Sequence, residues 1–315
     1  MGTVRAVARR TFRDPVSRAR FQQLAALTAV ALFIVVVSGA VVRLTDSGLG
    51  CDNWPSCGET PLPEQNFHAA VEFGNRMVAL VGIIIAIVTA VASTRVRGLR
   101  GPIVVASVAA AVGVVAQIPL GGLTVILDLH PVAVMSHFML ALVVIGLAVY
   151  VAVRAREQPS AQPSQRQSEA ASSVELRFLA WLATALVPLA AVLVVTGAVV
   201  TASGPHPGGD GVQRLGDFWS VLRVHVWVSG AFGIAYGVLL IGLWRFRELA
   251  ARELQLSVVV LAVLVTQLVI GEVQKENGLP WELVLAHVAL ATLVWSGMVA
   301  LAASLSSKTT LKLRP

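Results

Sequence analysis

The chain has 315 residues, of which 56% are hydrophobic and only 13% are charged, and its formal net charge is +7. This composition excludes a soluble globular domain, a disordered protein and a disulfide-dense secreted domain, which leaves a polytopic membrane protein. A basic balance of this size would suggest a nucleic-acid partner for a soluble protein, so the positions of the charges must be considered first.

Apolar segments long enough to cross a bilayer, which takes about 20 residues, occur eight times along the chain. They cover residues 22–42, 69–93, 102–122, 132–153, 176–200, 220–243, 254–273 and 282–304. We therefore expect an all-α membrane protein with eight transmembrane helices.

The basic residues predict the orientation of these spans. Nineteen of the 24 lysines and arginines fall on one side of the membrane if the N-terminus is cytoplasmic. The exceptions, which lie in or beside the opposite face, are Arg43, Arg76, Arg214, Arg223 and Lys275. The positive-inside rule then predicts that both termini are cytoplasmic, and we expect no nucleic-acid partner. No cleavable signal peptide is expected, because the first apolar segment follows a basic stretch and has the length of a true span.

A polar segment rich in proline and serine, residues 154–175, separates the first four spans from the last four. We interpret it as a flexible cytoplasmic linker. The expected organisation is a basic N-terminus (1–21), an N-terminal four-helix half (22–153), this linker, a C-terminal four-helix half (176–304) and a cytoplasmic tail (305–315). With four spans each, the halves would enter the membrane in the same orientation, as a parallel repeat.

An internal duplication is visible at an offset of 150 residues. The matched pairs are Gln117 with Gln267, Gly121 with Gly271, and His137 with His287. The first spans of the halves also share the motifs VVSGAVV and VVTGAVV. We therefore expect two pseudo-symmetric four-helix bundles. The same offset matches His225 with Asn75, so the chemistry of the two halves differs.

Four matched positions are predicted to lie at one depth, roughly 8 Å below the outer boundary of the membrane. They are Asn75, His137, His225 and His287. Two histidines at matched depth, His225 and His287, can ligate a haem iron from opposite faces of the ring, and we favour that role for this pair. A single histidine in a span can also be a helix-to-helix hydrogen-bonding group. Both roles stay open for His137, because its repeat-related partner, Asn75, is a poor iron ligand.

The first outer loop holds the only two cysteines, Cys51 and Cys57. Facing an oxidising compartment, they can form a disulfide, which would be either a structural staple or a redox-active pair. Beyond this loop, Glu72 is the only carboxylate within the second span, and an ionisable group there is a functional candidate by default. Spacings of three and four place it on one helix face with Asn75 and Arg76. Arg76 could simply neutralise it; alternatively, Glu72 accepts a proton from an oxidisable substrate or positions water.

Other residues of the outer face have less specific interpretations. His130 and His206 are expected to shape loops or to contact a haem propionate. Trp54, Trp219 and Trp281 stand at the outer ends of spans, which is typical of an interfacial aromatic belt. The outer arginines are interfacial groups that could also meet a propionate.

Motifs along nearly the whole membrane region resemble those of the haem A synthases, in particular the bacterial form with a cysteine pair in the first outer loop. In chain order they are VVRLTDSGLGCDNWPSCG, VEFGNR, QIPLGGLTV, LHPVAVMSHF, VTASGPHPGGD, LRVHVWV and LPWELVLAHVALA. The resemblance implies a multi-pass oxidoreductase of a bacterial cell membrane. Its reaction would oxidise the ring methyl of haem O to the formyl group of haem A, which serves haem-copper terminal oxidases.

The resemblance also implies roles for single residues. His225 and His287 would hold a haem b cofactor, while His137 would bind the substrate haem iron and Glu72 would be catalytic. The family pattern has a histidine where this chain has Asn75, so the substrate iron would have one axial ligand and one open face.

Arg76 is assigned to the same substrate site. A second outer cysteine pair, found in some relatives, is absent, so any redox role would fall on Cys51 and Cys57. The expected partners are haem O, the lipid bilayer, haem O synthase and terminal oxidase assembly factors.

Two other functions compete with this interpretation. A membrane b-type cytochrome, passing electrons between a quinol and an outer acceptor, would share the histidine pair but would not explain Glu72. A repeat-built transporter would place polar groups at the membrane midplane, whereas here they cluster near the outer surface.

Overall fold

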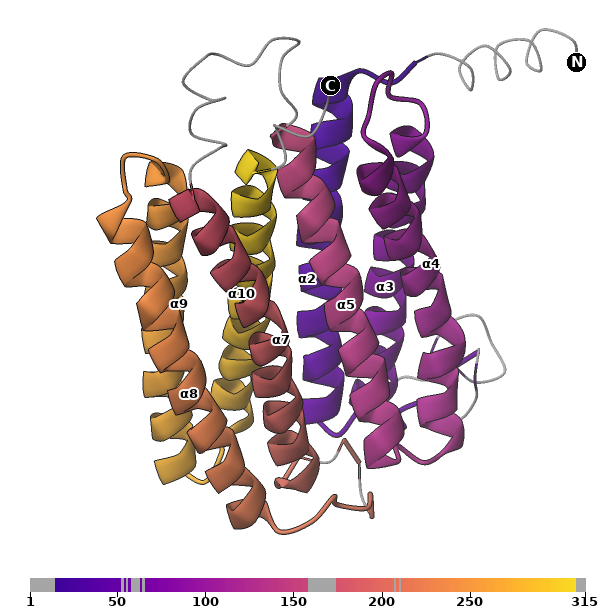
Figure 1. Ribbon diagram of the computed structural model, residues 1–315. Helices are drawn as coiled ribbons and strands as arrows, with labels where there is room; N and C mark the ends of the chain where they lie inside the picture. Colours follow the sequence, from indigo (N-terminus) through magenta and orange to yellow (C-terminus); the bar gives the residue numbers. More distant parts are fainter. Residues whose placement is uncertain are drawn as a thin grey trace, which may run out of the picture.

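The computed structural model describes residues 15–51, 54, 56–57, 63, 66–157, 174–206, 208–209 and 211–309. Over these residues the chain forms eight long α-helices and no strand (Figure 1). The helices are α2 (Arg18–Leu44), α3 (Phe67–Ser93), α4 (Gly101–Ile126), α5 (Pro131–Arg156), α7 (Val174–Ser203), α8 (Phe218–Arg245), α9 (Ala251–Glu276) and α10 (Trp281–Thr309). Each is long and apolar enough to cross a membrane, which confirms the eight predicted spans.

The helices begin where the sequence supplies capping groups. The side chains of Ser17, Asn66 and Asp217 each accept a hydrogen bond from a backbone N–H three residues further on, which satisfies a donor at the helix start. The side-chain and backbone hydrogen bonds with Ser220 lower the pKa of the Asp217 carboxyl. Pro131 instead opens α5 with a residue that has no N–H to satisfy.

The ends of the helices correct the predicted boundaries by up to five residues. Helices occupy both edges of the predicted linker, because α5 ends at Arg156 and α7 begins at Val174. Residues 158–173, which make up the rest of that linker, lie outside the described residues, as do 1–14 and 310–315. The predicted N-terminus is therefore described only from residue 15, with α2 beginning early at Arg18, and the predicted tail only as far as Thr309, where α10 ends.

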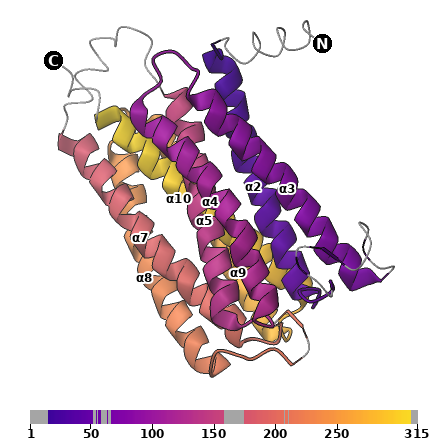
Figure 2. The ribbon, with the colours of Figure 1, turned by 90° about the vertical axis from the view of Figure 1, so that its right-hand side faces the viewer.

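In each half of the chain the four helices form a closed bundle, in which each helix contacts the next and the last contacts the first. Helices α2, α3, α4 and α5 contact one another in that order and α5 returns to α2, while α7, α8, α9 and α10 do the same. Figure 1 shows the two groups side by side, and Figure 2 views the bundle from the side of the first group. The junction between them runs mainly through α10, which packs on α5 and α2.

A tryptophan stands at the centre of this junction. Trp295 of α10 donates its indole N–H to the carbonyl of Leu142 on α5, with a nitrogen-to-oxygen distance of 2.7 Å. Gly146, one turn further along α5, makes room for the ring, because a Cβ there would lie 3.2 Å from the indole nitrogen. The two helices that carry His137 and His287 are thus the ones that join the halves.

Matching turns recur in the two halves. Leu129 and Leu279, 150 residues apart, both have positive φ, at 57° and 62°, a conformation that is uncommon for leucine. Their backbone nitrogens donate to the carbonyls of Thr124 and Gln274, which are again 150 residues apart. The duplication read from the sequence therefore extends to local backbone geometry, while the symmetry of the whole bundles stays a prediction.

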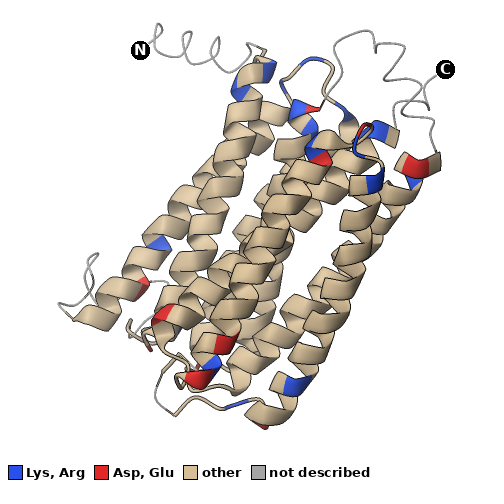
Figure 3. Ribbon diagram, turned by 90° about the vertical axis from the view of Figure 1, so that its left-hand side faces the viewer, with Lys and Arg blue, Asp and Glu red and all other residues tan. Residues whose placement is uncertain are grey.

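Charged residues are distributed unequally between the two ends of the bundle (Figure 3). Lysines and arginines gather at the end where α2 begins and α10 ends, which is the end predicted to be cytoplasmic. The long middle of the bundle is nearly free of charge in the described residues, as a hydrocarbon environment requires.

Candidate functional site

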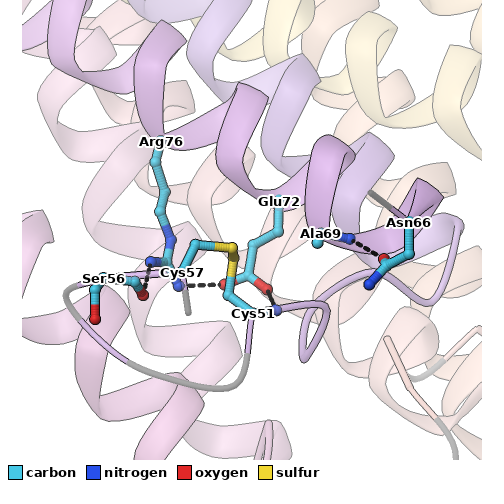
Figure 4. Close-up of a disulfide and its surroundings, with 7 residues drawn as sticks. All are labelled: Cys51, Ser56, Cys57, Asn66, Ala69, Glu72 and Arg76. Carbon is cyan, nitrogen blue, oxygen red and sulfur yellow. Dashed lines mark hydrogen bonds and ion pairs between the residues drawn. A yellow bond between two sulfur atoms is a disulfide. The ribbon is translucent and has the colours of Figure 1, made fainter. Parts of the chain in front are cut away.

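The carboxylate of Glu72 is buried at the end of the first half where α2 ends and α3 begins, which is the end predicted to face outward. The residue is 5% exposed and lies in the second turn of α3. Arg76 Nη2 donates to Glu72 Oε1 at 2.6 Å, and the backbone N–H of Cys51 donates to Oε2 at 2.9 Å (Figure 4). Arg76 also donates to the Ser56 carbonyl at 2.8 Å. The neutralising ion pair considered for Glu72 exists, and the first outer loop closes over it.

Cys51 and Cys57 form the predicted disulfide. Both cysteines are buried and pack against Ala69 and Phe73 of α3. The loop reaches α3 because Gly50 has no side chain, since a Cβ at Gly50 would collide with the backbone of α3. The structure confirms the pairing predicted from the sequence.

Asn75 lies one turn deeper on α3 and faces α2. Ser38 Oγ donates to Asn75 Oδ1 at 2.7 Å. Gly39 stands beside the same amide, where a Cβ would be 3.9 Å from Oδ1. Both α2 residues belong to the VVSGAVV motif, so this shared motif faces the position that differs between the halves.

His225 has the matching environment in the second half. Thr196 Oγ1 lies 3.0 Å from His225 Nδ1 and donates its own proton to the carbonyl of Leu193 at 2.8 Å. One arrangement satisfies both contacts: the Thr196 hydroxyl donates to Leu193 and His225 Nδ1 donates to Thr196, which leaves the lone pair of the imidazole on Nε2. Gly197 leaves room beside the ring, because a Cβ there would be 3.1 Å from Cε1.

The other two histidines share a second local pattern. A Cβ at Gly121 would lie 3.2 Å from His137 Cε1, and a Cβ at Gly271 would lie 3.1 Å from His287 Cε1. The Nδ1 atoms of both histidines are buried and have no hydrogen-bond partner in the described part of the chain. Each imidazole therefore has an unused nitrogen beside a position without a side chain.

Glutamines accompany these two histidines. Gln117 Nε2 donates to the His137 carbonyl at 3.2 Å, and Gln267 Nε2 lies 3.4 Å from His287 Nε2. No cluster of three histidine, cysteine or carboxylate ligands occurs among the described residues. Axial ligation of a haem iron needs only two donors.

The remaining outer residues connect loops. Arg43 donates to the carbonyls of Thr201 and His206, both at 3.2 Å, and so ties the end of α2 to the second half. His206 Nε2 lies 2.8 Å from the Leu279 carbonyl, while His130 is the residue before α5. These contacts agree with the loop-shaping role expected for both histidines.

Three contributors were missed by sequence reasoning. Ser38 hydrogen-bonds to Asn75, and Thr196 hydrogen-bonds to His225. The motifs VVSGAVV and VVTGAVV, which contain these hydroxyls at matching places, were the signal that could have predicted the contacts. The contact of Trp54 with Gly122 was also missed, because an aromatic residue at a span end is ordinarily explained by the interface. Their placement depends on helix packing.

Comparisons with known proteins point in one direction. A family model described as "Cytochrome oxidase assembly protein" (COX15-CtaA) matches residues 22–69 and 60–205. A heme A synthase of Geobacillus kaustophilus is 32% identical over 142 residues, which is 44% of this chain and 45% of the relative. A heme A synthase of Geobacillus thermodenitrificans is 29% identical over 144 residues, 45% of each chain.

A third relative has a different name. A protoheme IX farnesyltransferase of Haloarcula marismortui is 35% identical over 103 residues, which is 33% of this chain and 22% of the relative. The chain thus spans less than half the length of each of these curated relatives.

Proposed function

The chain belongs to the COX15-CtaA family of cytochrome oxidase assembly proteins, and from that membership we propose that it is a haem A synthase. The reaction would oxidise the ring methyl of haem O to the formyl group of haem A, for use in haem-copper terminal oxidases. The observation that carries this proposal is the buried Glu72 carboxylate, held at the outer end of a half that also presents the unused nitrogen of His137.

The first half would bind the substrate. His137 would ligate the iron of haem O, with Asn75 on the other side leaving one iron face without a strong ligand. Glu72 accepts two hydrogen bonds and retains further lone pairs. It can therefore accept the proton that the methyl carbon releases as electrons are removed from it, or a proton from a water, and its charge would stabilise positive charge developing at the carbon. Arg76 would keep Glu72 in place.

The second half would hold haem b, which when bound supplies one-electron redox chemistry. His225 fits as one axial ligand, because Thr196 orients its ring and leaves Nε2 free. His287 fits as the other, because its Nδ1 is buried without a partner. Gly197 and Gly271 keep the space beside the two rings open. Second-sphere bonds of this kind commonly fix the tautomer of a ligating histidine.

The proposed location is a bacterial cell membrane, with both termini in the cytoplasm. The excess of lysine and arginine at one end of the bundle supports this orientation. It places Glu72 and the four matched positions near the outer face. Haem O synthase is the proposed partner that supplies the substrate. Terminal oxidase assembly factors are the proposed recipients of the product.

Co-expression with a source of haem O, followed by pigment extraction, tests the proposal. Haem A in the extract supports the synthase. Haem b alone would replace it with an electron-carrying cytochrome, and an extract without haem from the purified chain would favour a transporter. A host that makes no haem A of its own is required.

A further inference from the structure

We infer that Trp54 is a substrate-binding residue of the first half and that Gly122, which has no side chain, lets the indole pack directly on the backbone of α4. This inference rests on the proposed function, because it concerns the site assigned to haem O. Trp54 would present an aromatic surface to the flat, largely apolar macrocycle or to its isoprenoid chain.

The contact between Trp54 and α4 is unusually close. A Cβ at Gly122 would lie 2.7 Å from the indole ring, a distance that side chains do not tolerate. Gly122 itself is buried, whereas Trp54 is 38% exposed. The indole therefore rests on the backbone of α4 with part of its surface still available. An interfacial belt residue needs no such glycine.

The position of this contact relates Trp54 to His137. Gly121, the residue before Gly122, faces the imidazole of His137, with a hypothetical Cβ 3.2 Å from Cε1. Consecutive residues of a helix lie at nearly the same height, 1.5 Å apart along the axis. The indole and the imidazole therefore contact α4 at the same depth, on adjacent sides of the helix.

The same loop also reaches Glu72. Trp54 lies between Cys51 and Cys57, and the disulfide closes the loop that carries it. Cys51 donates to Glu72, and the Ser56 carbonyl accepts from Arg76 (Figure 4). One short loop is thus bound to the catalytic candidate on α3 and to the backbone of α4. Trp54, Glu72 and His137 consequently surround the outer end of the same half.

The position of the second half that matches Gly122 carries no glycine, and the position that matches Glu72 carries no carboxylate. The residue 150 positions after Gly122 is Glu272, whose side chain is 66% exposed and pairs with Lys275 at 2.6 Å. The residue 150 positions after Glu72 is Leu222. A side chain and a charge at position 272 exclude an indole lying flat on the helix. The aromatic surface is therefore specific to the half that would take the substrate.

Titration of the purified full-length chain, isolated with its bound haem, measures the effect. We expect Trp54→Ala to weaken haem O binding about tenfold and to raise KM for haem A formation similarly, as loss of a large aromatic contact predicts. Trp54→Phe should recover most of the affinity. Gly122→Ala should behave like Trp54→Ala, because the added Cβ displaces the indole while alanine favours the helix.

The matched control is Trp219→Ala, which removes an outer-face tryptophan of the second half that is 59% exposed. It should leave haem O affinity at the wild-type value. The absorption of the isolated haem reports correct folding of each variant. If Trp54→Ala lowers the yield, the comparison of Gly122→Ala with wild type decides the question.

Wild-type affinity in both Trp54→Ala and Gly122→Ala would overturn the inference. Such a result would leave the proposed function intact, provided that the wild-type chain still makes haem A. Conversely, a wild-type chain that makes no haem A contradicts the proposed function, while the haem O titrations still decide whether Trp54 binds the macrocycle.

Discussion

The backbone N–H of Cys51 donates to the Glu72 carboxylate across 2.9 Å, which joins a disulfide-closed loop to the second turn of α3. A backbone donor held in this way cannot rotate out of place as a side chain can. With Arg76 on the other oxygen, the carboxylate has one orientation in a buried place. A carboxylate with fixed orientation is suited to act on one atom of a bound substrate.

Removing the charge of Glu72 should abolish haem A production while the second-half haem stays bound. Glu72→Gln keeps the size of the side chain but cannot accept a proton, so we expect a loss of roughly 100-fold or more in rate. Pigment extraction after co-expression measures the product. Glu282→Gln, at an exposed carboxylate in the first turn of α10, is the matched control. Activity retained in Glu72→Gln would refute the catalytic role.

Replacing either His225 or His287 with alanine should eliminate the low-spin spectrum of haem b. Two axial nitrogens are needed for that spectrum. The second half would offer His225 and His287, whereas the first half would offer His137 alone. Visible absorption of the purified chain is the measurement. His130→Ala, which changes an exposed residue before α5, should leave the spectrum unchanged. An unchanged spectrum in His225→Ala or His287→Ala would show that the ligand assignment is wrong.

Thr196 should tune haem b through His225. Thr196→Val removes the acceptor that fixes the tautomer, so we expect roughly tenfold weaker haem retention, the lower end of the range for such second-sphere changes. Thr196→Ser keeps the hydroxyl and should behave as wild type. The haem-to-protein ratio after purification and the reduction potential report the effect. Equal retention in the valine and serine variants would argue against this role.

Asn75→His should give the first half a second axial ligand. The expected result is a low-spin signal from haem O added to the purified chain, where the wild-type chain shows a single-ligand spectrum. The reason is that position 75 corresponds to His225 in the repeat, with Ser38 placed like Thr196. Electron paramagnetic resonance of the haem O complex distinguishes the two states. A wild-type complex that is already low-spin would contradict single ligation by His137.

Trp295→Phe should loosen the junction of the halves. It removes the hydrogen bond to the Leu142 carbonyl but keeps an aromatic ring, so the expected loss is about 1 kcal/mol, typical of such bonds between membrane helices. Thermal unfolding in detergent measures it. Trp227→Phe, at the lipid-facing surface of α8 with 80% of the residue exposed, is the control. Equal melting temperatures for both variants would contradict the role of this bond.

The spans could be predicted from the sequence because a bilayer requires long apolar segments, whatever their packing. Their ends could not be predicted from hydropathy, because capping by Ser17 and continuation of α10 to Thr309 depend on local hydrogen bonds that hydropathy does not register. The disulfide was predictable because only two cysteines exist and they are close in the chain.

By itself, the sequence determined the eight helices and the cysteine pair and predicted the candidate haem ligands, because these follow from apolar length, residue type and a repeat at constant offset. Only the tertiary structure decided which atoms are engaged. Packing of α2 on α3 and of α7 on α8 brought Ser38 to Asn75 and Thr196 to His225. The return of the first outer loop onto α4 brought Trp54 to Gly122. Such contacts depend on the rotation of each helix about its axis, which the packing of neighbouring side chains sets and hydropathy along one chain does not specify.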